Sequence, residues 1–278
     1  MRADSPRPMK KHLTTVLLVL VLLLGVGIML YPSVSDAINR AHQTKVLDNY
    51  VQAASELTEE ANEQILNQAR EYNDALRSAE DPLFHPEDFP DYDALLNPDG
   101  VGVMGYVSIP KIRVTLPIYH GTEDAVLQKG AGHLIGSSLP IGGPGTHAVL
   151  SAHRGLPSAM LFTDLDKLEA GDTFQICVLN QVLNYQVDRI SIVLPIETEE
   201  LRIGPDADYV TLMTCTPYGI NSHRLLVRGR RIESSQRRII VSSDAYRVDP
   251  ILIAAILFVP MLLVLLLIPK GRRKHRNA

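Results

Sequence analysis

The sequence predicts a mainly β domain, either a closed barrel or a sandwich, with a helical region before it and a membrane-spanning helix on each side. Three observations lead to this prediction. Short alternating runs rich in β-branched residues follow one another through residues 105–233. Residues 34–80 carry apolar side chains at every third or fourth position, which is typical of an amphipathic helix. Two blocks near the ends of the chain are almost purely aliphatic.

The two aliphatic blocks are long enough to cross a lipid bilayer. Leu13–Tyr31 contains 19 residues and Ile251–Ile268 contains 18, and neither includes a charge. As helices they would be about 27–29 Å long, close to the roughly 30 Å hydrocarbon core. We therefore expect transmembrane helices over 13–31 and 251–269. The alternative for the first block is a cleaved signal peptide, because Ser33-Val34-Ser35 has a small-x-small pattern.

Both tails outside these blocks are basic, and this predicts the topology. Residues 1–12 carry a net charge of +3 and residues 270–278 carry +5. Because Lys- and Arg-rich flanks stay in the cytoplasm, both termini should be cytoplasmic and the middle of the chain should lie outside. The whole chain has a net charge of −4, so the outer part carries −12. An acidic domain of this kind would repel phosphates, which argues against nucleic-acid binding.

The outer part divides by composition into four segments. Residues 32–80 form the helical region, whose apolar stripe should pack on the body of the domain. Residues 81–104 have many prolines and acids and no periodicity, and loops of this length are usually functional or disordered. Residues 105–233 hold the predicted strands, and residues 234–250 form a polar tether to the second transmembrane helix. The stripe consists of Val46, Tyr50, Ala53, Leu57, Ala61, Ile65, Ala69, Tyr72 and Leu76.

One stretch, TLMTCTPYGINSHR, places a cysteine near an arginine. Cys215 ends a predicted strand, and Arg224 begins the next strand after a turn rich in Pro, Gly and Asn. If these strands pair, the two side chains lie roughly 5 Å apart, where a guanidinium would favour a thiolate and stabilise an oxyanion. A core cysteine beside an exposed edge arginine remains an equal alternative at this point. A bridge between Cys215 and Cys177 is also open, although Cys177 lies in an alternating run typical of the core.

A cysteine nucleophile requires a proton acceptor, most often histidine. Position at a strand end favours His153, but His133 and His223 fit nearly as well, so the residues alone do not select one histidine for this role. The chain has no CxxC or HExxH motif and its histidines do not cluster, so no metal and no cofactor are predicted. The candidate histidines are His120, His133, His147, His153 and His223.

The same stretch, continued as TLMTCTPYGINSHRLLVRGRR, resembles the active-site motif of the sortases, membrane-bound transpeptidases of Gram-positive bacteria. Two further segments, GYVSIPKIRVTLPIYHGT and GHLIGSSLPIGGPGTHAVLSAHRGLP, resemble the class C, pilus-assembling branch, and the resemblance covers residues 80–232. It implies a closed eight-stranded sortase β-barrel and a catalytic set of His153, Cys215 and Arg224. It also implies a location at the cell membrane, with the catalytic domain on the extracellular face.

The resemblance further implies a reaction. The enzyme would cleave an LPxTG-like sorting signal between Thr and Gly and join the acyl group to a lysine amine of a pilin subunit. Its partners would be pilin or surface proteins that bear such a signal. Two alternatives stay open: a housekeeping sortase that anchors surface proteins to peptidoglycan, and a non-catalytic, membrane-tethered binding barrel.

Finally, the resemblance gives the long acidic loop a role as a lid over the active site. Class C enzymes carry an Asp-Pro-aromatic motif there, with the Asp on the catalytic arginine and the aromatic side chain over the cysteine. Here the motif would be Asp81-Pro82-Leu83, so that Leu83 replaces the aromatic residue and Phe84 follows it. We therefore expect a contact between Asp81 and Arg224, with either Leu83 or Phe84 covering Cys215.

Overall fold

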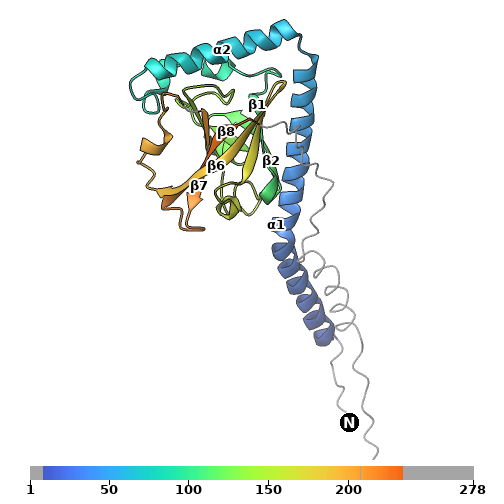
Figure 1. Ribbon diagram of the computed structural model, residues 1–278. Coiled ribbons are helices and arrows are strands. Elements are labelled where there is room, and N and C mark those ends of the chain that lie inside the picture. Colours follow the sequence, from blue (N-terminus) through green and yellow to red (C-terminus); the bar gives the residue numbers. More distant parts are fainter. Residues whose placement is uncertain (1–8, 207, 234–278) are drawn as a thin grey trace, which may run out of the picture.

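The computed structural model describes residues 9–206 and 208–233, with side chains from residue 16 onward. Within this part of the chain, a closed β-barrel follows two helices that meet at an angle (Figure 1). The predicted fold class, a mainly β closed barrel with N-terminal helices, is confirmed. The predicted tether, the second transmembrane helix and both ends of the chain lie outside the described residues.

The N-terminal region forms two helices where the sequence predicted a helical region. Helix α1 (Met9–Glu56) begins before the apolar block and continues unbroken past it, and α2 (Glu59–Ser78) follows after a short break. The break occurs because Thr58 has an extended backbone and its hydroxyl accepts a hydrogen bond from the Ala61 amide, which makes it the N-cap of α2. Part of α1 is long and apolar enough to cross a membrane.

The loop between α2 and the barrel contains two short 3-10 turns, η1 (Pro86–Asp88) and η2 (Tyr92–Ala94). Eight strands then form the barrel, with a four-residue helix, α3 (Asp124–Leu127), between the second and third strands. The strands are β1 (Val103–Ile109), β2 (Val114–His120), β3 (Ala131–His133), β4 (Thr146–Ser151), β5 (Thr173–Val178), β6 (Gln181–Val193), β7 (Asp208–Thr216) and β8 (His223–Ile232).

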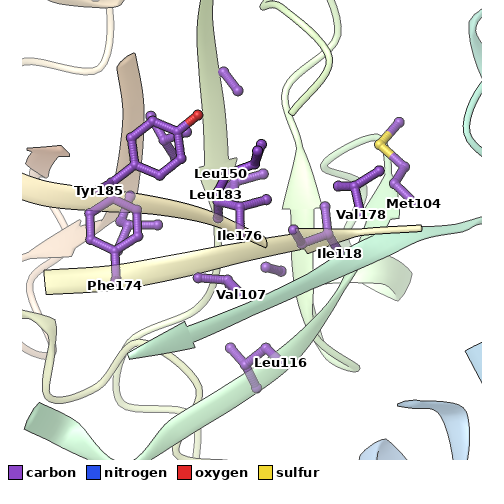
Figure 2. Packing of buried hydrophobic residues seen from close by; sticks show 14 of the residues in the cluster. Met104, Val107, Leu116, Ile118, Leu150, Phe174, Ile176, Val178, Leu183 and Tyr185 are labelled. Atoms are coloured by element: carbon purple, nitrogen blue, oxygen red, sulfur yellow. The ribbon is translucent and has the colours of Figure 1, made fainter. Parts of the chain in front are cut away.

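The strands close in the order β1-β2-β3-β4-β7-β8-β6-β5, with parallel pairs at β2–β3 and β4–β7. Large apolar side chains from every part of the barrel fill its interior, as Figure 2 shows for residues such as Val107, Ile176 and Tyr185. Because side chains alternate between the faces of a strand, each strand also presents an outer row. The outer rows of β4, β7 and β8 carry the candidate site.

Helix α1 lies along the barrel and is held to it by hydrogen bonds at several heights. The Asp36 carboxylate accepts from the Met160 amide at 2.8 Å, and the Gln43 side chain donates to the Lys129 carbonyl at 2.9 Å. Farther along, the buried Tyr50 hydroxyl donates to the Met104 carbonyl at 3.0 Å and accepts from the Leu179 amide at 2.8 Å. The helix that contains the predicted membrane span is therefore also a structural part of the barrel domain.

The Tyr50 hydroxyl offers a test of this attachment. We expect Tyr50→Phe to lower the free energy of unfolding by about 1–3 kcal/mol, because two buried backbone groups lose a hydrogen-bond partner while the ring volume is kept. Thermal or denaturant unfolding of the full chain in detergent measures this loss. Tyr218→Phe is the matched control, since Tyr218 is 62% exposed. Equal stability of the two variants would show that this contact does not hold α1 in place.

Candidate active site

The predicted pairing of the cysteine strand with the arginine strand is present. Strands β7 and β8 are antiparallel neighbours, and Cys215 lies directly opposite Arg224. The adjacent pair, Thr214 and Leu225, faces the barrel interior, so the alternation of side chains places Cys215 and Arg224 on the outer face. The Cys215 thiol is half-buried and free.

His153 reaches the same place from the other side of β7. Strand β4 runs parallel to β7, with Ser151 opposite Met213, and the pairing continues as the Ala152 amide donates to the Met213 carbonyl at 3.1 Å. One further position in this register sets His153 beside Cys215, again on the outer face. The three side chains suggested by the sequence therefore occupy neighbouring positions across β4, β7 and β8.

The remaining four candidate histidines have other surroundings. His133 and His147 are buried, and each has both ring nitrogens engaged by hydrogen bonds. His120 contacts two backbone carbonyls, those of Gly102 and Leu95. His223 lies opposite Thr216, one position before Arg224. Because side chains alternate along a strand, the His223 side chain lies on the other face of the sheet from Cys215. The structure thus distinguishes His153 from the other candidates by position.

Two charged residues that sequence reasoning missed adjoin His153. Asp124, at the start of α3, lies 3.2 Å from His153 Nε2 through its Oδ1 atom. Arg154, the next residue in the chain, donates to the Thr216 hydroxyl at 3.3 Å and forms an ion pair with Asp166. Arg154 thus links the segment after β4 to the end of β7, which helps to hold His153 next to Cys215.

Arg224 is positioned to receive an incoming group. Its Nη1 atom donates to the carbonyls of Asn221 and His223 at 3.3 and 3.2 Å, so the side chain turns toward the β7–β8 loop. Among the described residues it forms no ion pair with a carboxylate. A cation in this state can donate hydrogen bonds to a substrate carbonyl or to the oxyanion that develops from it.

A cluster of buried and partly buried apolar side chains packs on the outer face of the barrel beside Cys215 and Arg224. We call it the groove cluster. Two of its strand residues are Met213, two positions from Cys215, and Leu226, two positions from Arg224. Packed with them are Leu201 from the β6–β7 connection and Leu83 from the predicted lid. The full groove cluster consists of Leu83, Leu134, Val149, Val193, Leu201, Met213 and Leu226.

The predicted lid lies against the barrel, but one of its expected contacts is wrong. Asp81 forms an ion pair with Arg202 at 3.2 Å rather than with Arg224. Arg202 belongs to the same β6–β7 connection as Leu201, whereas Arg224 is bound by the carbonyls of its own loop. Asp81 also adopts a left-handed backbone with φ of 46°, which turns the chain at the start of the lid.

The structure also distinguishes between the two candidate covering residues. Leu83 is partly buried in the groove cluster, whereas Phe84 is 59% exposed. Pro82, the residue before Leu83, lies against Gly136, where an added Cβ atom would come within 2.2 Å of the Pro82 carbonyl oxygen. Residues 81–84 and part of the β6–β7 connection, including Leu201 and Arg202, line a cavity of about 370 Å³, and Cys215 is not among its lining residues.

Cys177 plays no part in this arrangement. It is buried on β5, packs with Tyr50, Val103 and Tyr106, and is not bonded to Cys215. The described residues contain no group of three or more His, Cys, Asp or Glu side chains placed to hold a metal ion. The chemistry available at the outer face is therefore that of a half-buried thiol, an imidazole and a guanidinium, a combination suited to acyl transfer through a thioester.

Comparison with known proteins agrees with this geometry. Residues 107–232 match the family model of the sortase domain. The structure superimposes on sortase C1 from Streptococcus agalactiae with a TM-score of 0.64 at 46% identity, covering 68% of this chain and 99% of that one. The chain belongs to the sortase family. As an enzyme it is a cysteine transpeptidase, and the predicted resemblance to class C sortases is confirmed.

Other relatives span a wider range of the family. Sortase C from Streptococcus pneumoniae matches with a TM-score of 0.63 at 44% identity, covering 70% of this sortase and all of that chain. Among full-length proteins, Sortase D from Bacillus subtilis is 29% identical over 142 residues, half of this chain and 69% of that protein. Sortase A from Streptococcus agalactiae is 32% identical over 117 residues, 41% of this chain and 47% of that protein.

The two buried histidines should make this sortase sensitive to acid. Burial lowers the pKa of both His133 and His147 from 6.5 to about 4, because the charged imidazolium loses its hydration. Folding therefore favours their neutral forms. The resulting stabilisation, about 3 kcal/mol per histidine, is fully present above pH 6.5 and is lost as the pH falls from about 6.5 to about 4.

Unfolding measured in urea at a series of pH values tests this expectation. The wild-type free energy of unfolding should fall steadily below pH 6.5, and His147→Gln should reduce the slope by about half, since glutamine does not titrate. His42→Gln, on the exposed surface of α1, is the control and should leave the slope unchanged. A wild-type stability that is flat between pH 6.5 and 4.5 would contradict the assignment.

Proposed function

We propose that this sortase is anchored in the membrane of a Gram-positive bacterium and polymerises pilin subunits on the extracellular face. It cleaves an LPxTG-like sorting signal between Thr and Gly and transfers the acyl group to a lysine amine of the next subunit. The observation that carries the proposal is the outer-face row formed by Cys215 on β7, Arg224 on β8 and His153 two residues beyond the end of β4. The match to class C sortases supports the pilin substrate.

Each residue of this row takes a separate role in the proposed reaction. The Cys215 thiol passes its proton to His153 and its sulfur attacks the threonine carbonyl carbon, while Arg224 donates hydrogen bonds to the oxygen as it becomes an oxyanion. When the C–N bond to glycine breaks, His153 protonates the leaving amine, and a thioester remains on Cys215. The lysine amine then attacks the thioester, His153 accepts its proton, and the Cys215 thiolate leaves.

The anchoring part of the proposal rests on α1 and on the basic tails. The large apolar side chains of α1 are exposed from Val16 to Ile38, which is the pattern of a helix that contacts lipid. Beyond Ile38 the apolar side chains of the helix turn onto the barrel, as Tyr50 does. Residues 251–269 would add a second span, and the basic tails 1–12 and 270–278 would keep both termini in the cytoplasm.

The proposed reaction leaves an intermediate that can be detected directly. When the full chain in detergent is mixed with a soluble LPxTG-like peptide, we expect mass spectrometry to show a thioester adduct on Cys215. Cys215→Ala should abolish the adduct, and because this variant retains Cys177, it also controls for reaction at any thiol. Arg224→Ala should lower kcat/KM by roughly a hundredfold or more through loss of the oxyanion contact.

The same preparation can be used to measure which amine accepts the acyl group. A peptide that carries the pilin lysine should accept the acyl group faster than a peptidoglycan-type amine. Faster transfer to the peptidoglycan amine would indicate the housekeeping function instead, and an unreactive Cys215 with the lid displaced would refute catalysis at this site.

We also propose that residues 81–84 act as a lid that restrains access to the groove cluster. Leu83 should contribute more than the Asp81–Arg202 ion pair to the free energy that holds the lid closed. Its side chain is partly buried, whereas Asp81 and Arg202 are 49% and 54% exposed. An exposed ion pair contributes at most about 1 kcal/mol, which corresponds to about fivefold in rate. Truncating a partly buried leucine removes a larger free energy, which corresponds to roughly a tenfold or greater change in rate.

Hydrolysis of the soluble peptide measures lid opening. We expect Leu83→Ala to raise the rate roughly tenfold and Arg202→Ala to raise it by less than about fivefold. Phe84→Ala is the matched control from the same loop and should have little effect, since its ring faces solvent. If all three variants hydrolyse the peptide at the wild-type rate, residues 81–84 do not restrain the site.

A further inference from the structure

The end of the barrel that carries Cys215 also carries most of its exposed apolar side chains. Outside α1, eight large apolar residues of the described chain are exposed, and five of them lie on two segments at this end. We call these five the rim patch. Its members are Ile192, Leu194, Ile196, Tyr218 and Ile220, with exposed fractions of 63%, 43%, 81%, 62% and 72%.

Strand register places the two segments of the rim patch beside each other and beside the active site. Val193 at the end of β6 lies opposite Arg224, which in turn lies opposite Cys215. The segment 192–196 at the end of β6 and the β7–β8 loop 217–222 therefore leave the barrel at the same end. Neither segment contains a charged residue, but two charged side chains border them: the Glu197 carboxylate accepts from the Leu194 amide at 2.8 Å, and Arg224 donates to the Asn221 carbonyl at 3.3 Å.

Helix α1 indicates which way this end of the barrel faces. Asp36 contacts Met160, in the connection that follows His153, whereas Tyr50 contacts Met104 and Leu179 at the opposite end of the barrel. Contacts along α1 thus run from the Cys215 end to the far end as the helix leaves the apolar block. In Figure 1 the orange end of β7 lies at the end of the barrel nearest the dark-blue half of α1.

The distance from the membrane follows from the helix rise. Five residues separate Tyr31, the last residue of the apolar block, from Asp36, which corresponds to about 8 Å. Exposed apolar residues continue on α1 as far as Ile38. The level at which α1 stops facing lipid is therefore about the level at which the barrel begins.

We propose that the rim patch inserts into the headgroup region of the bilayer that holds α1, so that the entrance to the active site lies at the lipid surface. This inference rests on the membrane anchoring proposed above. Apolar side chains together with a tyrosine are the residues that favour this interfacial layer. Because the two segments themselves carry no charge, and the two groups that border them, Glu197 and Arg224, have opposite signs, the contact should depend little on salt.

The absence of tryptophan from the chain allows a direct test. Full-length Ile220→Trp and Ile196→Trp variants are placed in phosphatidylcholine nanodiscs made with or without brominated acyl chains. We expect the tryptophan emission of both to be blue-shifted and to be lost in the brominated discs, at low and at high salt. Val101→Trp is the matched control, since Val101 is 67% exposed near the start of β1 at the far end, and its emission should stay unchanged.

The outcomes separate this proposal from the proposed reaction. Quenching of the Ile220→Trp variant no stronger than that of Val101→Trp would overturn membrane docking, even where Cys215 still forms its thioester with soluble peptide. Quenching that disappears at high salt would overturn it as well, because the contact would then depend on charge. So would a blue shift that occurs only when sorting-signal peptide is added, since the patch would then receive substrate rather than lipid.

Discussion

The pairing of β7 with β8 is the interaction on which the site depends. It places Cys215 opposite Arg224, and through β4 and β6 it also fixes His153 and Val193 on either side of them. Backbone hydrogen bonds of a closed barrel hold this register, so the row of side chains needs no contact of its own to stay assembled. A shift of one residue would turn Cys215 into the core and leave Arg224 outside.

The sequence predicts the fold and the pairing of Cys215 with Arg224 well, because both arise from short-range patterns. Alternation identifies the strands, and nine positions with a turn between them suffice to bring Cys215 beside Arg224. The histidine is different. His153 and Cys215 meet through parallel strands 62 residues apart, a pairing that no local pattern encodes, and only resemblance to known sortases selected it.

Contacts between loops were the least predictable part of the site. The expected partner of Asp81 was wrong because Arg202 comes from the long β6–β7 connection, whose path depends on how Leu201 packs in the groove cluster. Asp124 beside His153 was missed for a similar reason, since α3 is a four-residue helix placed by the barrel around it. Such contacts depend on where whole segments come to rest, and local spacing does not report that.

In the proposed anchoring, helix α1 would connect the reaction to the membrane more closely than an anchor with a flexible linker. Its hydrogen bonds to the barrel at Asp36, Gln43 and Tyr50 fix both the height and the tilt of the domain. A substrate whose sorting signal precedes its own membrane span would present that signal within a few residues of the lipid surface. With the orientation proposed above, the Cys215 end of the barrel would meet the signal there without having to reorient, which would lower the entropic cost of the encounter.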